Sequence, residues 1–106
     1  MRTLRFIVEG RQIRLEPRNN LADHNTSLED YTRAEFSFSK EWLNSPKVVA
    51  FYSRLGAEYP PQALKDGQSC LIPLEALEKR FFKIQVLGRN GLKTNKIEID
   101  RKGGCV

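Results

Sequence analysis

The sequence predicts an all-β protein, an antiparallel β-sandwich of the immunoglobulin-like or jelly-roll-like kind, with one short helix at about residues 73–79. The dipeptide Asn90-Gly91 is the strongest short-range hairpin signal, because a type I′ turn needs positive φ at both central residues. Several short segments alternate apolar and polar residues, which is typical of half-buried strands. The aromatic residues, 9% of the chain, mostly lie in such segments, which favours a sandwich over a helical bundle.

The chain of 106 residues is long enough for one modest core, so we expect a single domain over residues 1–102 and a flexible tail over 103–106. Cys70 and Cys105 are too few and too far apart for a disulfide framework or a zinc site, so we expect reduced thiols and no cofactor. The N-terminus lacks the apolar core of a signal peptide, and no segment is apolar enough to cross a membrane.

The last hairpin covers residues 80–100. If Asn90 and Gly91 form the whole loop, apolar residues meet on one face and a Lys–Glu pair meets on the other, while a slip of one residue would reverse both faces. The predicted pairs are Leu87–Thr94, Gln85–Lys96, Ile84–Ile97, Lys83–Glu98 and Phe82–Ile99.

A first hairpin is predicted around Gly10-Arg11, where glycine at the first central position allows a type II′ turn. The competing turn at Glu9-Gly10 would place Arg5 opposite Arg14, a destabilising like-charge pair. The preferred register pairs Val8 with Ile13, Phe6 with Leu15 and Arg5 with Glu16, and it directs Leu4, Phe6, Val8, Ile13 and Leu15 to the core.

Residues 17–33 are polar and lack periodicity, so they predict a long loop. Thr26 and Glu29 have capping-box spacing, which allows one or two helical turns through Leu28 and Tyr31. Loops of this length are either functional or disordered, and the sequence leaves both readings open.

The middle of the chain predicts further strands. Residues 34–39 alternate, and residues 47–53 are nearly all apolar, as in a central strand covered on both faces. Trp42, before a turn at residues 44–46, is expected in the core. A turn at Asp66-Gly67 leads into a buried strand at 69–72, and Pro73 suits the first position of the short helix.

The sequence contains no recognisable set of catalytic residues. His24 is the only histidine and lies in the polar loop, and Glu75 with Glu78 suits a helix surface better than a carboxylate pair. We therefore expect no enzyme.

The net charge of +5 is spread along the chain and interleaved with acids, which argues against a nucleic-acid partner. The basic residues of the last hairpin could still contact phosphate, and exposed tyrosines could form a platform for a sugar or a protein. The candidate interaction surface consists of Tyr52, Tyr59, Arg89, Lys93 and Lys96.

Five segments of the chain resemble those of a known group of proteins. They are AEFSFSKEW, KVVAFYSRLGAEYPPQALKDG, SCLIPLEAL, FKIQVLG and TNKIEI. In them the chain resembles small β-sandwich proteins of phages and prophages, similar to the N-terminal domain of siphophage upper baseplate proteins. The resemblance implies a tail- or baseplate-associated structural protein that assembles with copies of itself or with other virion proteins. It also implies residence in the host cytoplasm during assembly and then in the virion, and it carries over no binding residue. The alternatives are a carbohydrate- or protein-binding module and, third, a nucleic-acid-binding accessory protein.

Overall fold

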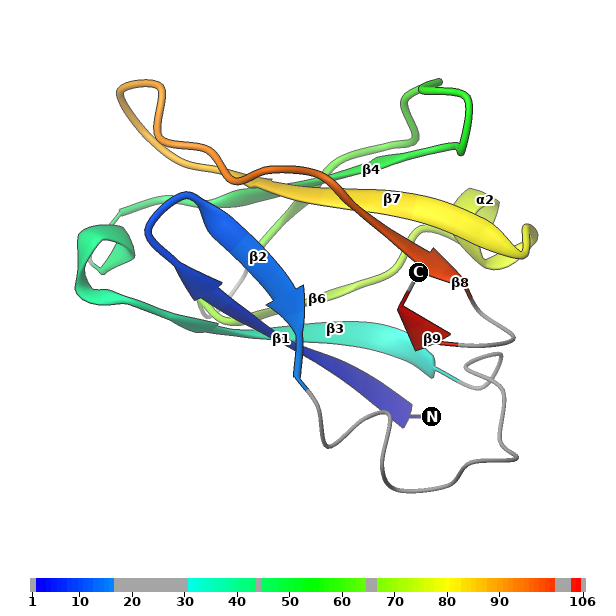
Figure 1. The fold of residues 1–106 in the computed structure, drawn as a ribbon, viewed down its shortest axis with the longest axis horizontal. Coiled ribbons are helices and arrows are strands. Elements are labelled where there is room, and N and C mark those ends of the chain that lie inside the picture. The colour runs from blue at the N-terminus through cyan, green and yellow to red at the C-terminus, as the bar shows by residue number, and fades with distance from the viewer. Residues whose placement is uncertain (1, 17–30, 44, 65–66, 101–103, 106) are drawn as a thin grey trace.

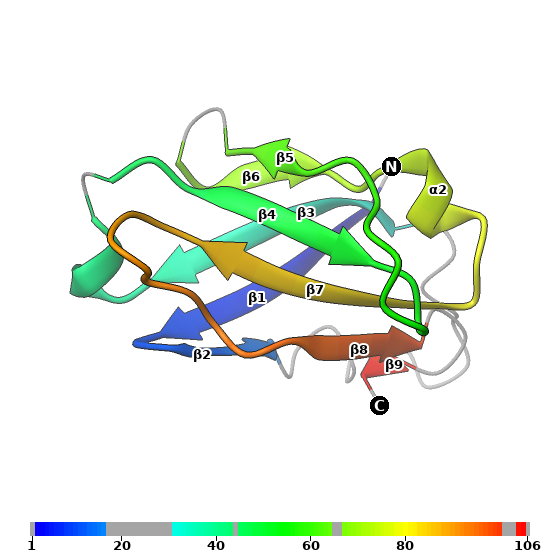
Figure 2. The same ribbon diagram turned by 90° about the horizontal axis from the view of Figure 1, so that it is seen from above.

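The structure is a computed structural model that describes residues 2–16, 31–43, 45–64, 67–100 and 104–105. Its strands form two sheets that pack face to face, as Figures 1 and 2 show, so the predicted all-β sandwich is confirmed. In spatial order, the four-stranded sheet contains β2 (Gln12–Leu15), β1 (Arg2–Glu9), β3 (Tyr31–Phe38) and β6 (Ser69–Leu71). The five-stranded sheet contains β5 (Gln62–Ala63), β4 (Val48–Tyr52), β7 (Phe81–Leu87), β8 (Ile97–Asp100) and β9 (Gly104–Cys105).

The first hairpin, β1–β2, has the register that the sequence predicts. Phe6 faces Leu15 and Val8 faces Ile13, while Glu16 N donates to Arg5 O at 2.8 Å. Gly10 has φ +56°, the left-handed value that the first central position of a type II′ turn requires. The glycine therefore sets the register that places the apolar side chains of both strands in the core.

The pairing of β1 with β3 is parallel, whereas the sequence predicted antiparallel sheets. This pairing aligns Leu4 with Ala34, Phe6 with Phe36 and Val8 with Phe38, so the inward residues of the two strands share one face. The strand begins at Tyr31, because its backbone already pairs with β1 there. The predicted loop over 17–33 is therefore wrong for 31–33, and its remaining part through residue 30, including Thr26 and Glu29, lies outside the described residues.

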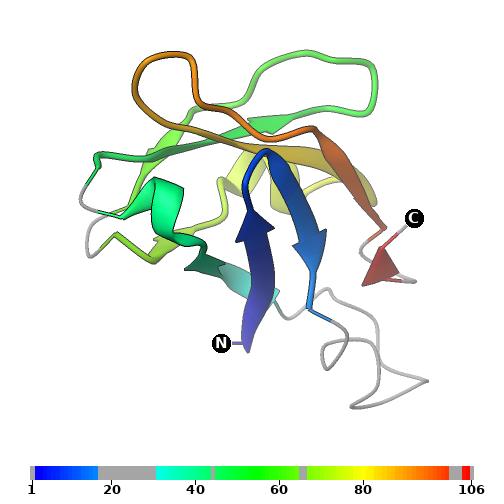
Figure 3. The same ribbon diagram turned by 60° about the vertical axis from the view of Figure 1, so that its left-hand side comes forward.

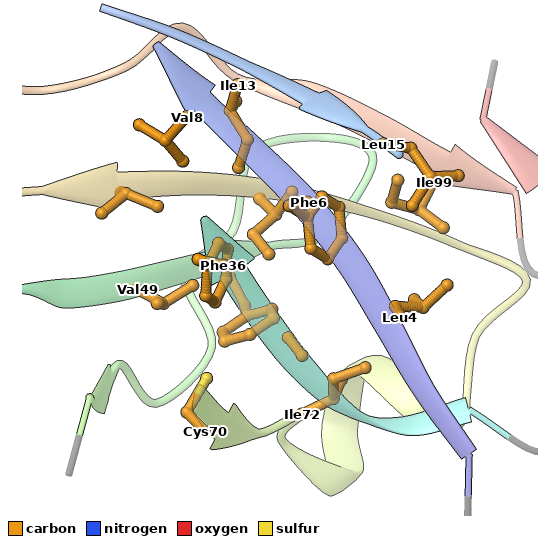
Figure 4. Packing of buried hydrophobic residues seen from close by; sticks show 14 of the residues in the cluster. Leu4, Phe6, Val8, Ile13, Leu15, Phe36, Val49, Cys70, Ile72 and Ile99 are labelled. Atoms are coloured by element: carbon orange, nitrogen blue, oxygen red, sulfur yellow. The ribbon is translucent and has the colours of Figure 1, made fainter. Parts of the chain in front are cut away.

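The core lies between the sheets and is filled by aliphatic and aromatic side chains from both (Figure 4). Phe6 and Phe36 stack with ring centroids 5.2 Å apart. Trp42, at the end of the short 3-10 helix η1 (Lys40–Trp42), is fully buried, and its Nε1 donates to Gly10 O at 2.7 Å. The predicted core position of Trp42 is confirmed, and its polar atom is satisfied as burial requires.

The last hairpin, β7–β8, follows the predicted register only at the end away from its turn. Phe82 faces Ile99, Lys83 faces Glu98 and Ile84 faces Ile97. The ladder stops there, so the predicted Gln85–Lys96 pair is absent, and Leu87 faces Lys93 where Thr94 was predicted.

The shift by one residue is already present next to the turn, where Gly88 N donates to Leu92 O at 2.7 Å. Asn90 and Gly91 have φ of 56° and 76°, as a type I′ turn requires, and Leu92 N donates to Arg89 O at 3.0 Å. Beyond the turn, however, Val86 N donates to the hydroxyl Oγ1 of buried Thr94 at 3.0 Å. A side-chain oxygen thus takes the place of a backbone carbonyl where the shifted register ends, before the regular ladder begins at Ile84 and Ile97.

The irregular segment after this turn links the two sheets. Asn95 N donates to Arg11 O at 3.0 Å, and Asn95 Oδ1 accepts a hydrogen bond from Ile13 N at 3.0 Å. Ile13 lies in the edge strand β2 and Arg11 in the turn before it, so Asn95 satisfies backbone groups that this edge would otherwise expose. Figure 3 shows the β1–β2 hairpin beside this part of the chain.

The short helix is present but shorter than predicted. α2 spans Leu74–Leu77, and Pro73 precedes it as the N-cap in extended conformation, with its carbonyl accepting from Ala76 N and Leu77 N. The predicted tail differs as well, because Gly104–Cys105 form β9 and pair with the edge of β8. Residues 103 and 106 of that tail lie outside the described residues.

Candidate interaction surface

At one end of the five-stranded sheet, the loop after β4 passes the junction of α2 and β7 (Figure 2). Residues of these segments line a hollow. This hollow, called the end pocket below, has a volume of about 280 Å³. Its walls are mostly apolar, and every charged residue in its lining is a cation. The lining residues are Ser53, Arg54, Leu55, Tyr59, Lys79, Arg80 and Phe81.

A tight turn after β4 forms one wall of the end pocket. Ser53 N donates to Ala57 O at 2.7 Å, Ser53 Oγ accepts from Ala57 N at 2.9 Å, and Gly56 takes φ +98° between them. The turn holds Leu55 at its tip with 97% of the side chain exposed. A large apolar side chain is thus presented to solvent on a hydrogen-bonded support.

The ring of Phe81, the first residue of β7, forms another wall. The guanidinium carbon of Arg54 lies 3.9 Å from the ring centroid, and that of Arg80 lies 4.9 Å from it. Both distances are within the range of cation–π attraction. The half-buried ring therefore positions two positive charges at the mouth of the pocket.

Two carboxylates of β8 hold the same guanidinium groups from the other side. Arg54 Nε lies 3.2 Å from Glu98 Oε2, while Arg80 donates from Nε and Nη2 to the two oxygens of Asp100 at 2.9 Å each. The hydrogen bonds to Asp100 raise the pKa of Arg80. The arginine side chains are 56% and 54% exposed, against 16% and 11% for their acidic partners. The surface therefore presents the cations, and the anions lie beneath them.

The structure brings together two of the residues predicted as an interaction surface. Lys96 Nζ lies 4.1 Å from the ring centroid of Tyr52, on the face of the five-stranded sheet that points away from the core. Tyr52 is only 8% exposed, and its hydroxyl donates to Gln85 Oε1 at 3.1 Å. Burial, and then the charge of Glu58, raises the pKa of Tyr52. Its ring is packed and covered, whereas the sequence suggested an exposed one.

Tyr59 lies on the other side of the sheet from Tyr52. Glu58 pairs with Tyr52, and Tyr59 N donates to the backbone of the core-facing Phe51 at 2.9 Å. Because side chains alternate along strands, Tyr59 shares the face of Phe51, and it packs against the core. The two tyrosines therefore form no common platform, although Tyr59 reaches the end pocket.

The remaining predicted residues, Arg89 and Lys93, lie at the far end of β7 from the end pocket. Arg89 precedes the Asn90-Gly91 turn, Lys93 follows it, and both are exposed. Figure 1 shows this turn and α2 at opposite ends of the molecule. The predicted surface is thus divided between the turn, the middle of the sheet and the end pocket.

Sequence reasoning missed Arg54, Leu55 and Phe81 as site residues. The one local signal was a leucine in a glycine-containing turn, where polar residues are usual. The arginines and Phe81 gave no such signal, because their proximity depends on the pairing of β4 with β7.

The rest of the described chain adds no chemical centre. In that part, no group of three or more His, Cys, Asp and Glu side chains is placed to hold a metal ion. Burial raises the pKa of the Cys70 thiol to about 12, which makes it a poor nucleophile. His24 lies outside the described residues.

No helix in the described ranges is long and apolar enough to span a membrane. Comparisons with protein-family models, with curated proteins and with solved structures find no match to this chain.

Proposed function

We propose that this chain is a non-enzymatic assembly protein that works through protein–protein contacts. The observation that carries the proposal is the end pocket, an apolar hollow of about 280 Å³ beside a fully exposed leucine. Contiguous exposed apolar surface rimmed by polar groups is typical of protein interaction sites, whereas single exposed apolar residues are common, so the hollow and the leucine carry the proposal together. The resemblance to phage and prophage sandwich proteins supports assembly in a tail or baseplate, in the host cytoplasm and then in the virion.

A nucleic-acid role is less well supported, because the aromatic rings on the outer face of the five-stranded sheet are already occupied. Lys96 covers Tyr52, and Arg54 and Arg80 flank Phe81. Proteins that bind single strands present open rings on which bases stack. A base would have to displace a cation from each of these rings.

A carbohydrate-binding platform is also less well supported. Sugar platforms and other aromatic binding faces need ring faces that solvent reaches, and Tyr52 is 8% exposed. Tyr59 lies on the opposite side of the sheet, so the pair has no shared surface.

The proposal is tested by co-expressing the chain with the polypeptides encoded beside it and measuring the purified mixture by light scattering. We expect a complex of fixed stoichiometry that persists on dilution. The proposal is overturned if the chain stays monomeric with every co-expressed polypeptide. It is also overturned if the chain binds duplex or single-stranded DNA with an affinity that falls steeply with salt, as phosphate contacts require.

A further inference from the structure

We propose that the end pocket receives one large apolar side chain from a partner polypeptide whose adjacent residues are acidic. The inference rests on the proposed function and deepens it, because it names the chemistry of the partner segment. It follows from the size of the pocket, the charge of its rim and the charge of the whole chain.

The size and lining of the pocket admit one large apolar side chain. A volume of about 280 Å³ lies just below the range of about 300–1,000 Å³ that is usual for small-molecule sites. The half-buried Phe81 and Tyr59 line the pocket together with Leu55, and the exposed Leu55 would lose its contact with water when a partner side chain enters. An aromatic or aliphatic side chain is therefore the occupant that the lining favours.

The rim favours acidic neighbours for that side chain. Arg54, Lys79 and Arg80 are the charged residues of the lining, and all three are cations. The carboxylates that pair with the two arginines are largely covered, at 16% and 11% exposure, so an approaching partner meets guanidinium groups first. A guanidinium has five N–H donors, and a single carboxylate cannot accept hydrogen bonds from all of them. The same arginine can therefore hold its internal acid and contact a second one.

A second copy of this chain is a poor occupant. A two-fold dimer places the same patch of each subunit against the other, which would bring the two sets of rim cations together. Each copy also carries a net charge of +5, so long-range repulsion opposes this contact. An acidic partner of different sequence is attracted by the same charges.

The test measures binding of the full chain to fluorescein-labelled nine-residue peptides by fluorescence anisotropy. The probe has one central phenylalanine flanked by aspartate and glutamate residues. Two matched probes carry serine in place of the phenylalanine, or lysines in place of the acids. We expect saturable binding of the first peptide, and at least tenfold weaker binding of each of the other two.

Paired variants locate the binding at the end pocket. Leu55→Ser should weaken binding at least fivefold, while Leu43→Ser, the same change at an exposed leucine beside η1 at the other end of the molecule, should leave it unchanged. Lys79→Glu should weaken binding more than Lys93→Glu, which makes the same change of net charge at the far hairpin turn. Thermal unfolding of each variant checks that the fold is retained.

The possible results separate the inference from the proposed function. The inference is overturned if the serine peptide binds as tightly as the phenylalanine peptide, or if no peptide binds. It is also overturned if Leu43→Ser weakens peptide binding as much as Leu55→Ser does. A stable complex with a co-expressed polypeptide that survives Leu55→Ser would retain the assembly function and reject the end pocket as its contact. Loss of that complex in Leu55→Ser, together with selective peptide binding, would support both.

Discussion

The substitution Gly88→Ala tests whether the indole of Trp42 needs the space that glycine leaves at residue 88, directly after β7. A Cβ atom built on Gly88 would lie 2.9 Å from Cζ3 and 3.3 Å from Cε3 of the indole, while ordinary contacts begin at about 3.4 Å. The indole is restrained elsewhere: Nε1 donates to Gly10 O at 2.7 Å, and the ring of Phe38 lies 5.7 Å away between centroids. The ring therefore has little freedom to move aside.

Two opposing terms set the magnitude. Overpacking a buried site by one carbon costs about 1–3 kcal/mol of unfolding free energy. Replacing glycine with alanine restricts the unfolded chain and returns about 0.4–1 kcal/mol, since Gly88 does not need a positive φ. The difference of these terms spans about 0–2.6 kcal/mol, and because the indole has little room to move we expect a net loss of about 1–2 kcal/mol. This loss lowers the melting temperature by about 4–16 °C at roughly 4–8 °C per kcal/mol for a domain of this size.

The assay is urea unfolding followed by far-ultraviolet circular dichroism, with the same substitution repeated in a Trp42→Phe background. The smaller ring lacks the atoms that the new Cβ would meet, so Gly88→Ala should cost at least about 1 kcal/mol less there. Gly91→Ala is the matched control. Its Cβ meets nothing within 4 Å, but φ is +76°, so it should cost about 1–2 kcal/mol in both backgrounds.

The reasoning fails if Gly88→Ala is neutral or stabilising. It also fails if the cost is the same with Trp42 and with phenylalanine at that position, because the loss would then come from the backbone and not from the indole. A dependence of Gly91→Ala on residue 42 would show that the background itself changes the hairpin.

Three further predictions use the same unfolding measurement. Asn95→Ala should lower the unfolding free energy by about 1 kcal/mol, because the N–H of Ile13 loses its acceptor. Asn95→Asp should lower it less, since aspartate keeps an oxygen at that place. Equal losses would argue against the hydrogen bond between Ile13 N and the Asn95 side chain. Tyr52→Phe should lower the unfolding free energy by about 1 kcal/mol, and by much less in a Gln85→Leu background that already lacks the acceptor. The same cost in both backgrounds would refute a stabilising hydrogen bond between the Tyr52 hydroxyl and Gln85. Burial raises the pKa of the Cys70 thiol from 9.0 to about 12, so this thiol ionises first in the unfolded chain. The free energy of unfolding should therefore fall as pH rises from about 9 to 12. Cys70→Ala should show a shallower fall, and an identical slope would contradict the raised pKa of Cys70.

Features set by neighbouring residues could be predicted from the sequence. The type II′ turn at Gly10-Arg11 follows from one glycine and one unfavourable charge pairing, and the whole register of the first hairpin follows from it. The burial of Trp42 follows from its size in a small domain. These predictions succeed because the information lies within about ten residues.

Features that join distant segments could not be predicted in this way. The parallel pairing of β1 with β3 depends on matching inward faces across the intervening chain, and no turn residue marks it. The register shift beside the turn joins Gly88 N to Leu92 O, and the Thr94 hydroxyl meets Val86 N only after the hairpin has closed. The end pocket has the same character, because Arg54 and Phe81 meet through the β4–β7 pairing that places Tyr52 opposite Lys83.

The outer faces of the two sheets present charge differently, and this difference would orient the proposed partner. On the four-stranded sheet, Arg5 pairs with Glu35 and Arg14 with Glu9, with exposures of 57% and 49% in the first pair and 56% and 64% in the second. Acid and base are equally accessible there, so the pairs nearly cancel for an approaching molecule. At the end pocket the acids are covered and the arginines are not. The acidic partner that we propose would therefore be steered to the five-stranded sheet, where charge would speed the encounter and the apolar pocket would supply the contact that holds it.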